Sequence, residues 1–164
     1  MDRRGSGTNF TGPIRVNDNQ FINSVTVEIT SAELLALNAT PKTIIPAPER
    51  TGDAHIVEGM DIYKPDGTAY VVGAGEDFVL RYTDGSGTIV TGTASAGFLD
   101  QTTEEKRVEV PQSAVGTATI SLDPTADAPI VANILLGEVT GGDTSVFVTV
   151  FYRTAPTVIT VPSR

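Results

Sequence analysis

Apolar and polar residues alternate along several short runs of the chain. Residues 24–29 place valine or isoleucine at every second position, which is the period of a strand with one buried face. Residues 145–152 also alternate, but valines occupy one face while bulky residues, including Phe147 and Phe151, occupy the other. Bulk on both faces predicts a central strand that is covered on each side.

Further strand-like runs follow one another between turn residues. Lys64-Pro65-Asp66-Gly67 predicts a tight turn, because proline presets φ and glycine accepts positive φ. Thr83-Asp84-Gly85-Ser86-Gly87 predicts the turn of a β-hairpin over residues 78–93. The remaining runs of strand type lie at residues 43–46, 55–63, 69–72, 107–110, 117–122, 130–136 and 157–162.

Helical signals are brief. Thr30-Ser31-Ala32-Glu33 fits a capping box, in which the threonine hydroxyl and the glutamate carboxylate each accept a backbone N–H of the first turn. Three leucines follow, and Asn38 and Pro41 end the segment after one or two turns. Residues 96–101 predict a second helical turn.

The sum of these elements is an all-β chain of nine to eleven short strands. Turn signals between short strands are typical of a β-sandwich or jelly roll of antiparallel strands, here with one or two short helical turns. Residues 1–20 contain glycine and polar residues but few core-type residues, which predicts an extended N-terminal arm or flexible tail. Residues 21–164 then form a single β-sandwich domain, a size that one hydrophobic core can support.

Charge narrows the range of partners. The net charge is −9, and residues 1–20 hold three arginines against two aspartates, so the other 144 residues carry −10. An acidic surface repels phosphate, which disfavours nucleic acids and anionic membranes as partners. An acidic surface also favours solubility, or binding to a basic protein partner. No apolar run approaches the ~18 residues of a membrane span, and the N-terminus lacks the apolar core of a signal peptide.

The residues needed for catalysis are scarce. His55 is the only histidine, and no G-x-S-x-G sequence accompanies any serine, so a Ser-His-acid triad is not indicated. With one histidine and no cysteine, a closed zinc site cannot be built. The neighbouring acids Glu76-Asp77 and Glu104-Glu105 would point to opposite faces of a strand. The sequence therefore predicts a protein that is not an enzyme, with no catalytic or cofactor-binding residues.

Calcium is the best of the ligand hypotheses. Asp84-Gly85-Ser86-Gly87 and Gly141-Gly142-Asp143 place oxygen ligands on tight turns, but neither has the spacing of an EF-hand loop. A β-turn needs aspartate and glycine for its own geometry. The turn interpretation is preferred, and no metal site is predicted.

Several segments, taken in order, resemble a known class of protein. They are 31–41 (SAELLALNATP) with 44–48 (IIPAP), then 80–85 (LRYTDG) with 96–99 (AGFL), and finally 141–144 (GGDT) running into 148–154 (VTVFYRT). Over about residues 24–154 the chain is similar to small virion structural proteins of tailed bacteriophages, including head decoration or cement proteins. The similarity is one of composition and order, and no reactive site contributes to it.

The resemblance implies a function in assembly. A decoration protein of this kind would lie on the capsid surface of the virion after synthesis in the host cytoplasm. It would bridge neighbouring subunits of the major capsid protein, commonly as a homotrimer near threefold positions. The arm at residues 1–20 would add a strand to an exposed sheet edge of a neighbour.

Two alternatives remain at this point. One is a neck, tail or fibre component of the virion, which differs from a decoration protein in copy number. The other is a carbohydrate-binding or adhesion module. The absence of tryptophan disfavours it, although four tyrosines offer aromatic faces for sugar rings: Tyr63, Tyr70, Tyr82 and Tyr152. Strand order, oligomeric state and the contact surface are left open by the sequence.

Overall fold

The computed structural model describes residues 22–111, 114–115, 118–119 and 123–157. Within these residues the chain is all-β, as predicted, with twelve strands and one short helix. The strands are β1 (Asn23–Ile29), β2 (Lys42–Ile45), β3 (Asp53–Lys64), β4 (Tyr70–Val71), β5 (Phe78–Tyr82), β6 (Ile89–Thr93), β7 (Glu105–Glu109), β8 (Ala114–Val115), β9 (Ala118–Thr119), β10 (Ile130–Ile134), β11 (Thr140–Gly141) and β12 (Val146–Pro156). The helix is α1 (Ser31–Leu34). The predicted arm at residues 1–20 lies outside the described residues.

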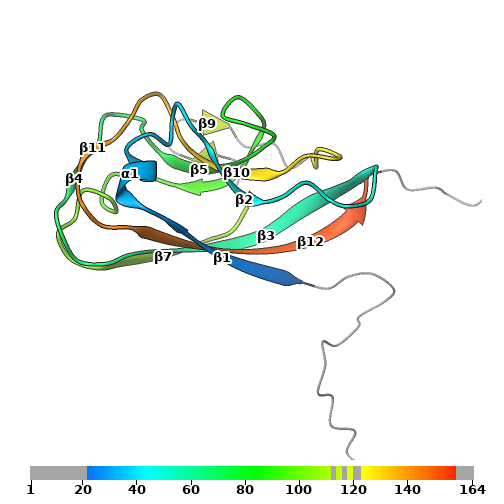
Figure 1. The fold of residues 1–164 in the computed structure, drawn as a ribbon, viewed down its shortest axis with the longest axis horizontal. Helices are drawn as coiled ribbons and strands as arrows, with labels where there is room; N and C mark the ends of the chain where they lie inside the picture. The colour runs from blue at the N-terminus through cyan, green and yellow to red at the C-terminus, as the bar shows by residue number, and fades with distance from the viewer. Residues whose placement is uncertain (1–21, 112–113, 116–117, 120–122, 158–164) are drawn as a thin grey trace, which may run out of the picture.

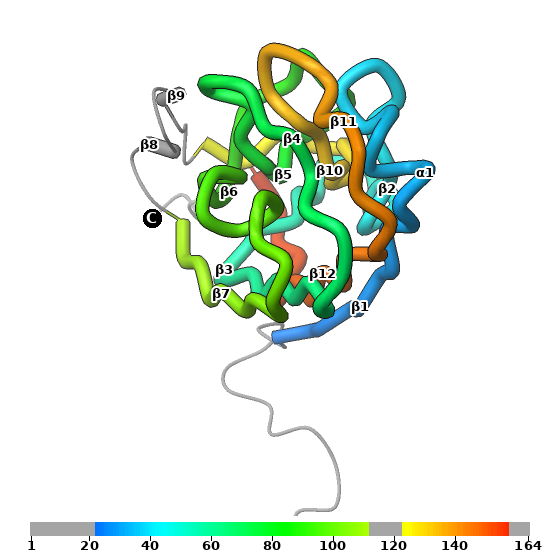
Figure 2. Tube along the Cα trace, turned by 90° about the vertical axis from the view of Figure 1, so that its left-hand side faces the viewer, coloured from blue at the N-terminus to red at the C-terminus, as the bar shows by residue number. Residues whose placement is uncertain are grey.

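Two four-stranded antiparallel sheets pack face to face and form a β-sandwich. The first, which we call sheet A, has the order β1-β12-β3-β7, and the second, sheet B, has the order β2-β10-β5-β6. Sheet A is the lower layer in Figure 1 and sheet B the upper one. Figure 2 shows the two layers from the end of the sandwich. Two strands of sheet A, β3 and β12, run for 12 and 11 residues, longer than the sequence predicted.

The core lies between the two sheets. Val146, Val148 and Val150 of β12 face inward and are fully buried, as are Met60 and Ile62 of β3. From sheet B, the side chains that meet them are those of Phe78, Leu80, Ile130, Ala132 and Ile134. Period-2 alternation therefore sends one apolar set of each strand into a shared interior, whose burial provides most of the stabilisation.

The helix α1 forms where the capping box was predicted. The backbone N–H of Glu33 donates to the Thr30 hydroxyl over 3.3 Å, and the backbone N–H of Thr30 donates to the Glu33 carboxylate over 2.8 Å. Leu34 and Leu37 are fully buried and join the core near one end of the sandwich (Figure 1). The helix has only four residues, so tertiary packing rather than helix propensity holds it.

The predicted hairpin is confirmed. Strand β5 pairs antiparallel with β6, with Phe78 opposite Thr93. In the connecting turn the Asp84 carboxylate accepts hydrogen bonds from the backbone N–H of Ser86 over 2.8 Å and from its hydroxyl over 2.7 Å. A Cβ on Gly87 would overlap the Tyr82 carbonyl oxygen, so the turn requires glycine there.

The second helical turn is present but does not extend into a helix: Phe98 and Leu99 both donate to the Ser95 carbonyl, over 3.1 and 2.8 Å. The strand predicted at residues 107–110 begins two residues earlier, as β7 at Glu105. Ranges 117–122 and 157–162 lie mostly outside the described residues, so these two predictions stay untested beyond β9.

Candidate interaction surface

His55 occupies a structural position. Its side chain is buried, Nε2 lies 2.8 Å from the Pro46 carbonyl oxygen, and Nδ1 lies 2.9 Å from the Thr154 hydroxyl. The Tyr152 ring meets the imidazole edge-on, with centroids 5.1 Å apart. Because both ring nitrogens have partners, the imidazole holds β3 to β12 and to the loop after β2.

The paired acids do not converge either. Glu76 turns back and accepts the backbone N–H of Gly73 over 2.6 Å, whereas Asp77 is buried and accepts the N–H of Ser95 over 3.3 Å. Glu104 accepts a hydrogen bond from the Tyr63 hydroxyl over 3.1 Å, and this bond raises the pKa of Tyr63. Each of these carboxylates fixes a turn or a neighbouring side chain.

The turns considered for calcium use their carboxylates internally. Asp143 accepts both the backbone N–H and the hydroxyl of Thr68, over 2.9 and 2.8 Å, and these bonds lower the pKa of Asp143. The Ser86 bonds lower the pKa of Asp84 in the same way. Among the described residues no group of three acidic or histidine side chains is arranged to hold a metal ion.

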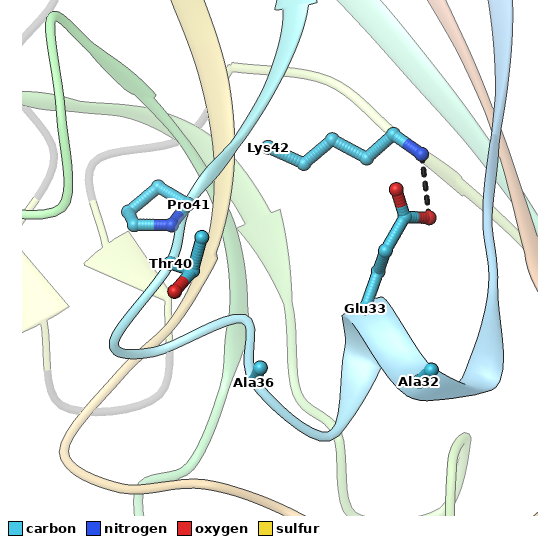
Figure 3. A pocket seen from close by; sticks show the side chains of 6 residues that line it. All are labelled: Ala32, Glu33, Ala36, Thr40, Pro41 and Lys42. Atoms are coloured by element: carbon cyan, nitrogen blue, oxygen red, sulfur yellow. Dashed lines mark hydrogen bonds and ion pairs between the residues drawn. The ribbon is translucent and has the colours of Figure 1, made fainter.

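Two shallow hollows lie on the surface. The one in Figure 3 has a volume of about 390 Å³ and is lined by small side chains next to the Glu33–Lys42 ion pair, in which the charged atoms are 2.6 Å apart. The bonds from Lys42 and from the Thr30 backbone lower the pKa of Glu33 to about 2. The other hollow, of about 410 Å³, lies beside His55 and Tyr152. The charged side chains of Glu49, Arg50 and Asp53 also line this second hollow.

The two sheets differ in what covers their outer faces. Sheet B is buried on both faces: Val79, Val131 and Asn133 point away from the core yet have exposed fractions of 0–4%. The Asn133 amide donates to the carbonyls of Leu37 and Asn38, in the loop that covers this face. In sheet A all other described elements lie on the core side (Figure 1), which leaves the opposite face open.

We call this open side of sheet A the outer face and define it by Tyr63, Val108, Val110, Phe147 and Phe151. Phe147 pairs with Tyr63 across the strands, and their rings lie 6.4 Å apart. Phe151 lies opposite Gly59, where an added Cβ would meet its ring at 3.9 Å, an ordinary van der Waals contact. Val108 and Val110 are 68% and 59% exposed.

Sequence reasoning placed β12 correctly at the centre of a sheet, between β1 and β3. It was incomplete about the second face, because Phe147 and Phe151 are only half-buried and no other described strand covers them. No second layer of described strands packs against this face of β12.

Polar side chains also lie on the outer face. Thr149 lies between Phe147 and Phe151 along β12, shares a hydroxyl–hydroxyl bond of 2.8 Å with Thr26, and stands opposite Asp61 of β3. The Asp61 carboxylate lies 3.5 Å from the Lys106 ammonium, and the Arg153 guanidinium lies 2.7 Å from Glu58. A row of polar residues therefore crosses the face between its aromatic rings.

No protein-family model matches the chain. No curated protein matches it either. Among solved structures it is similar to a chain of the "Cyanophage Pam1 capsid asymmetric unit", with 17% sequence identity and a TM-score of 0.46 over 93% of this chain and 99% of that one.

Two further observations bear on the possible partners. Tyr70 and Tyr82 are buried, so only Tyr63 and Tyr152 of the four tyrosines have accessible rings, which weakens the carbohydrate-binding alternative. In the described part of the chain, no helix has the length and apolar character needed to cross a bilayer.

Proposed function

We propose that this chain is a virion structural protein of a tailed bacteriophage, which decorates the capsid surface and bridges neighbouring subunits of the major capsid protein. It acts as a homotrimer, without nucleic acid, membrane or cofactor, and has no enzymatic activity. The outer face of sheet A is the surface that meets the capsid. Its half-buried aromatic rings and exposed valines are the observation that carries the proposal.

The contrast between the two sheets supports this role. The loop that contains Leu37 and Asn38 covers outward side chains of sheet B, whereas Val108 and Val110 beside sheet A remain in contact with solvent. Exposed valines and half-buried rings, mixed with polar side chains on one open face, favour an interaction site there. His55, Asp84 and Asp143 have local partners within the chain, so burial of the outer face is the action that we propose.

A capsid supplies a physical reason for such a protein. Packaged nucleic acid strains the shell outward, and a subunit bound across two neighbours adds buried area that expansion must break. A specific interface of standard size buries about 1,600 Å². Because a decoration protein is present in many copies, modest stabilisation at each contact adds up over the particle.

Substitution of the outer face tests the proposal. Val108→Glu with Val110→Glu should abolish binding to capsids that lack the protein, measured by co-sedimentation of the purified full chain. The matched control is Val71→Glu with Leu136→Glu, because these residues are 67% and 80% exposed but lie outside the outer face. Full binding by the outer-face variant, with an unchanged melting temperature, would refute the proposed surface.

A further inference from the structure

Strand β1 leaves one edge of sheet A unpaired among the described strands. It pairs with β12 on one side only, with Thr26 opposite Thr149 and Glu28 opposite Phe147. The Glu28 carbonyl accepts a hydrogen bond from the Lys42 ammonium over 2.7 Å, so it points away from β12. In an antiparallel ladder the outward direction recurs at every second residue. Ser24 and Thr26 therefore also present their backbone groups to the edge.

The side chains of β1 leave room for a further strand. Val25 and Val27 face the core but remain half-buried, and they pack against its rim. Between Asn23 and Val27 the edge has no proline or lysine, the residues that commonly prevent strand addition. Only its end at Glu28 is occupied, by Lys42.

The chain contains a segment that matches this edge. In residues 13–17, Pro-Ile-Arg-Val-Asn, the apolar Ile14 and Val16 alternate with Arg15. Set antiparallel to β1 with Arg15 opposite Thr26, the segment places Ile14 and Val16 beside Val27 and Val25. Arg15 then falls on the same face as the acidic Glu28, on a body whose net charge is −10.

Proline fits the end of this register. Pro13 falls opposite Glu28, where an added strand would otherwise donate a backbone N–H to the Glu28 carbonyl. Proline has no N–H, and that carbonyl already accepts from Lys42. Pro13, which has no N–H to donate, thus lies opposite a carbonyl that already has a hydrogen-bond donor.

We infer that residues 13–17 of one copy add a strand to the free edge of β1 in a second copy, so that copies of the chain exchange their N-terminal segments. This inference names the contact that joins copies in the proposed homotrimer and rests on that part of the proposed function. Within one chain the same register would require the chain to reverse direction between residue 17 and the start of β1 at Asn23. Exchange between copies requires only that the five intervening residues span a distance of at most ~18 Å.

Introduced cysteines test the exchange directly, because the natural chain has none. Val16→Cys and Val25→Cys lie in a directly opposed pair whose spacing suits a disulfide. Mixing the two single-cysteine full-length chains and oxidising them should give a covalent dimer that contains one of each. A chain that carries both cysteines provides the comparison. The exchange is refuted if no mixed dimer forms, or if the disulfide forms only within the chain that carries both cysteines.

Charge and backbone variants provide an independent measurement. Arg15→Glu should weaken self-association in solution at least tenfold by analytical ultracentrifugation, whereas Arg4→Glu makes the same charge change outside the segment and should have little effect. Thr26→Pro removes the outward N–H and should dissociate the oligomer, while Thr26→Ala keeps that N–H and should not. Equal association by Arg15→Glu and Arg4→Glu contradicts the inference. Because no capsid is present, failure here is distinguishable from failure of the capsid-binding proposal.

Discussion

The Lys42 ammonium donates to the backbone carbonyl of Glu28 over 2.7 Å, and this bond joins the edge strands of the two sheets. Lys42 begins β2, the edge of sheet B, and Glu28 lies near the end of β1, the edge of sheet A. The same ammonium pairs with the Glu33 carboxylate of α1 over 2.6 Å. The Lys42 side chain therefore links both sheets and the helix α1 at the edge of the sandwich formed by β1 and β2.

Lys42→Met should destabilise the fold by about 1–2 kcal/mol, because it leaves the Glu28 carbonyl and the Glu33 carboxylate without this donor. Urea denaturation at pH 7 measures the loss. Lys106→Met is the control: Lys106 is 62% exposed and its partner Asp61 is 3.5 Å away, so the change should stay within about 0.5 kcal/mol. Equal losses of unfolding free energy in the two variants would contradict a role of Lys42 in joining the two sheets.

Acid should weaken the fold through Glu33. Hydrogen bonds from Lys42 and from the Thr30 backbone lower the pKa of Glu33 from 4.5 to about 2 in the folded chain. A carboxylate whose pKa is lower when folded contributes stability above its unfolded pKa, and loses it as pH falls through its folded pKa. This contribution should therefore be complete above about pH 4.5 and disappear progressively towards pH 2.

Glu33→Gln measures this contribution, because other acids titrate in the same range and cancel in the difference. The stability gap between the natural chain and the variant should be constant from pH 7 to about 5 and then narrow towards pH 2. Parallel curves over the whole range would show that Glu33 does not titrate as the structure requires.

Burial predicts opposite results for two aliphatic residues of sheet A. Ile62 is fully buried in the core, so Ile62→Ala should cost about 2–5 kcal/mol of unfolding free energy. Val108 lies on the outer face, 68% exposed, so Val108→Ala should change the stability of the isolated chain by no more than about 0.5 kcal/mol. A large loss for Val108→Ala would mean that this face is already covered within the chain.

Asn133 should be essential for holding the loop of Leu37 and Asn38 against the outward face of sheet B. Its buried amide donates to the carbonyls of Leu37 over 2.9 Å and Asn38 over 3.1 Å. Asn133→Leu leaves both carbonyls without this donor and should cost about 2 kcal/mol, measured by thermal or urea unfolding. Faster hydrogen exchange in the loop after α1 should accompany the loss, and unchanged exchange would contradict this role.

Local features of the fold could be predicted from the sequence, since residues close together in the chain create them. The capping box of Thr30 and Glu33 and the turn at Asp84 are found where the pattern placed them. The contact from Lys42 to Glu28 could not be predicted, because it depends on how β1 and β2 meet across the sandwich. The outer face was missed for a related reason: alternation shows that Phe147 is bulky, but not what covers it.

Composition shows that histidine and cysteine are scarce, but it does not predict what the polar residues contact. His55 is buried, and both of its ring nitrogens have hydrogen-bond partners. Its partners Pro46 and Thr154 are 9 and 99 residues away in the chain. Only the fold brings the second of these to the imidazole.

The most direct test of the central claim is a cryo-electron microscopy map of the native particle that contains this chain. We predict density for the sandwich on the outside of the head, in many copies at threefold positions, with the outer face of sheet A against the major capsid protein. A particle that carries the chain only at the neck or tail, or a head whose surface lacks it, would contradict the account.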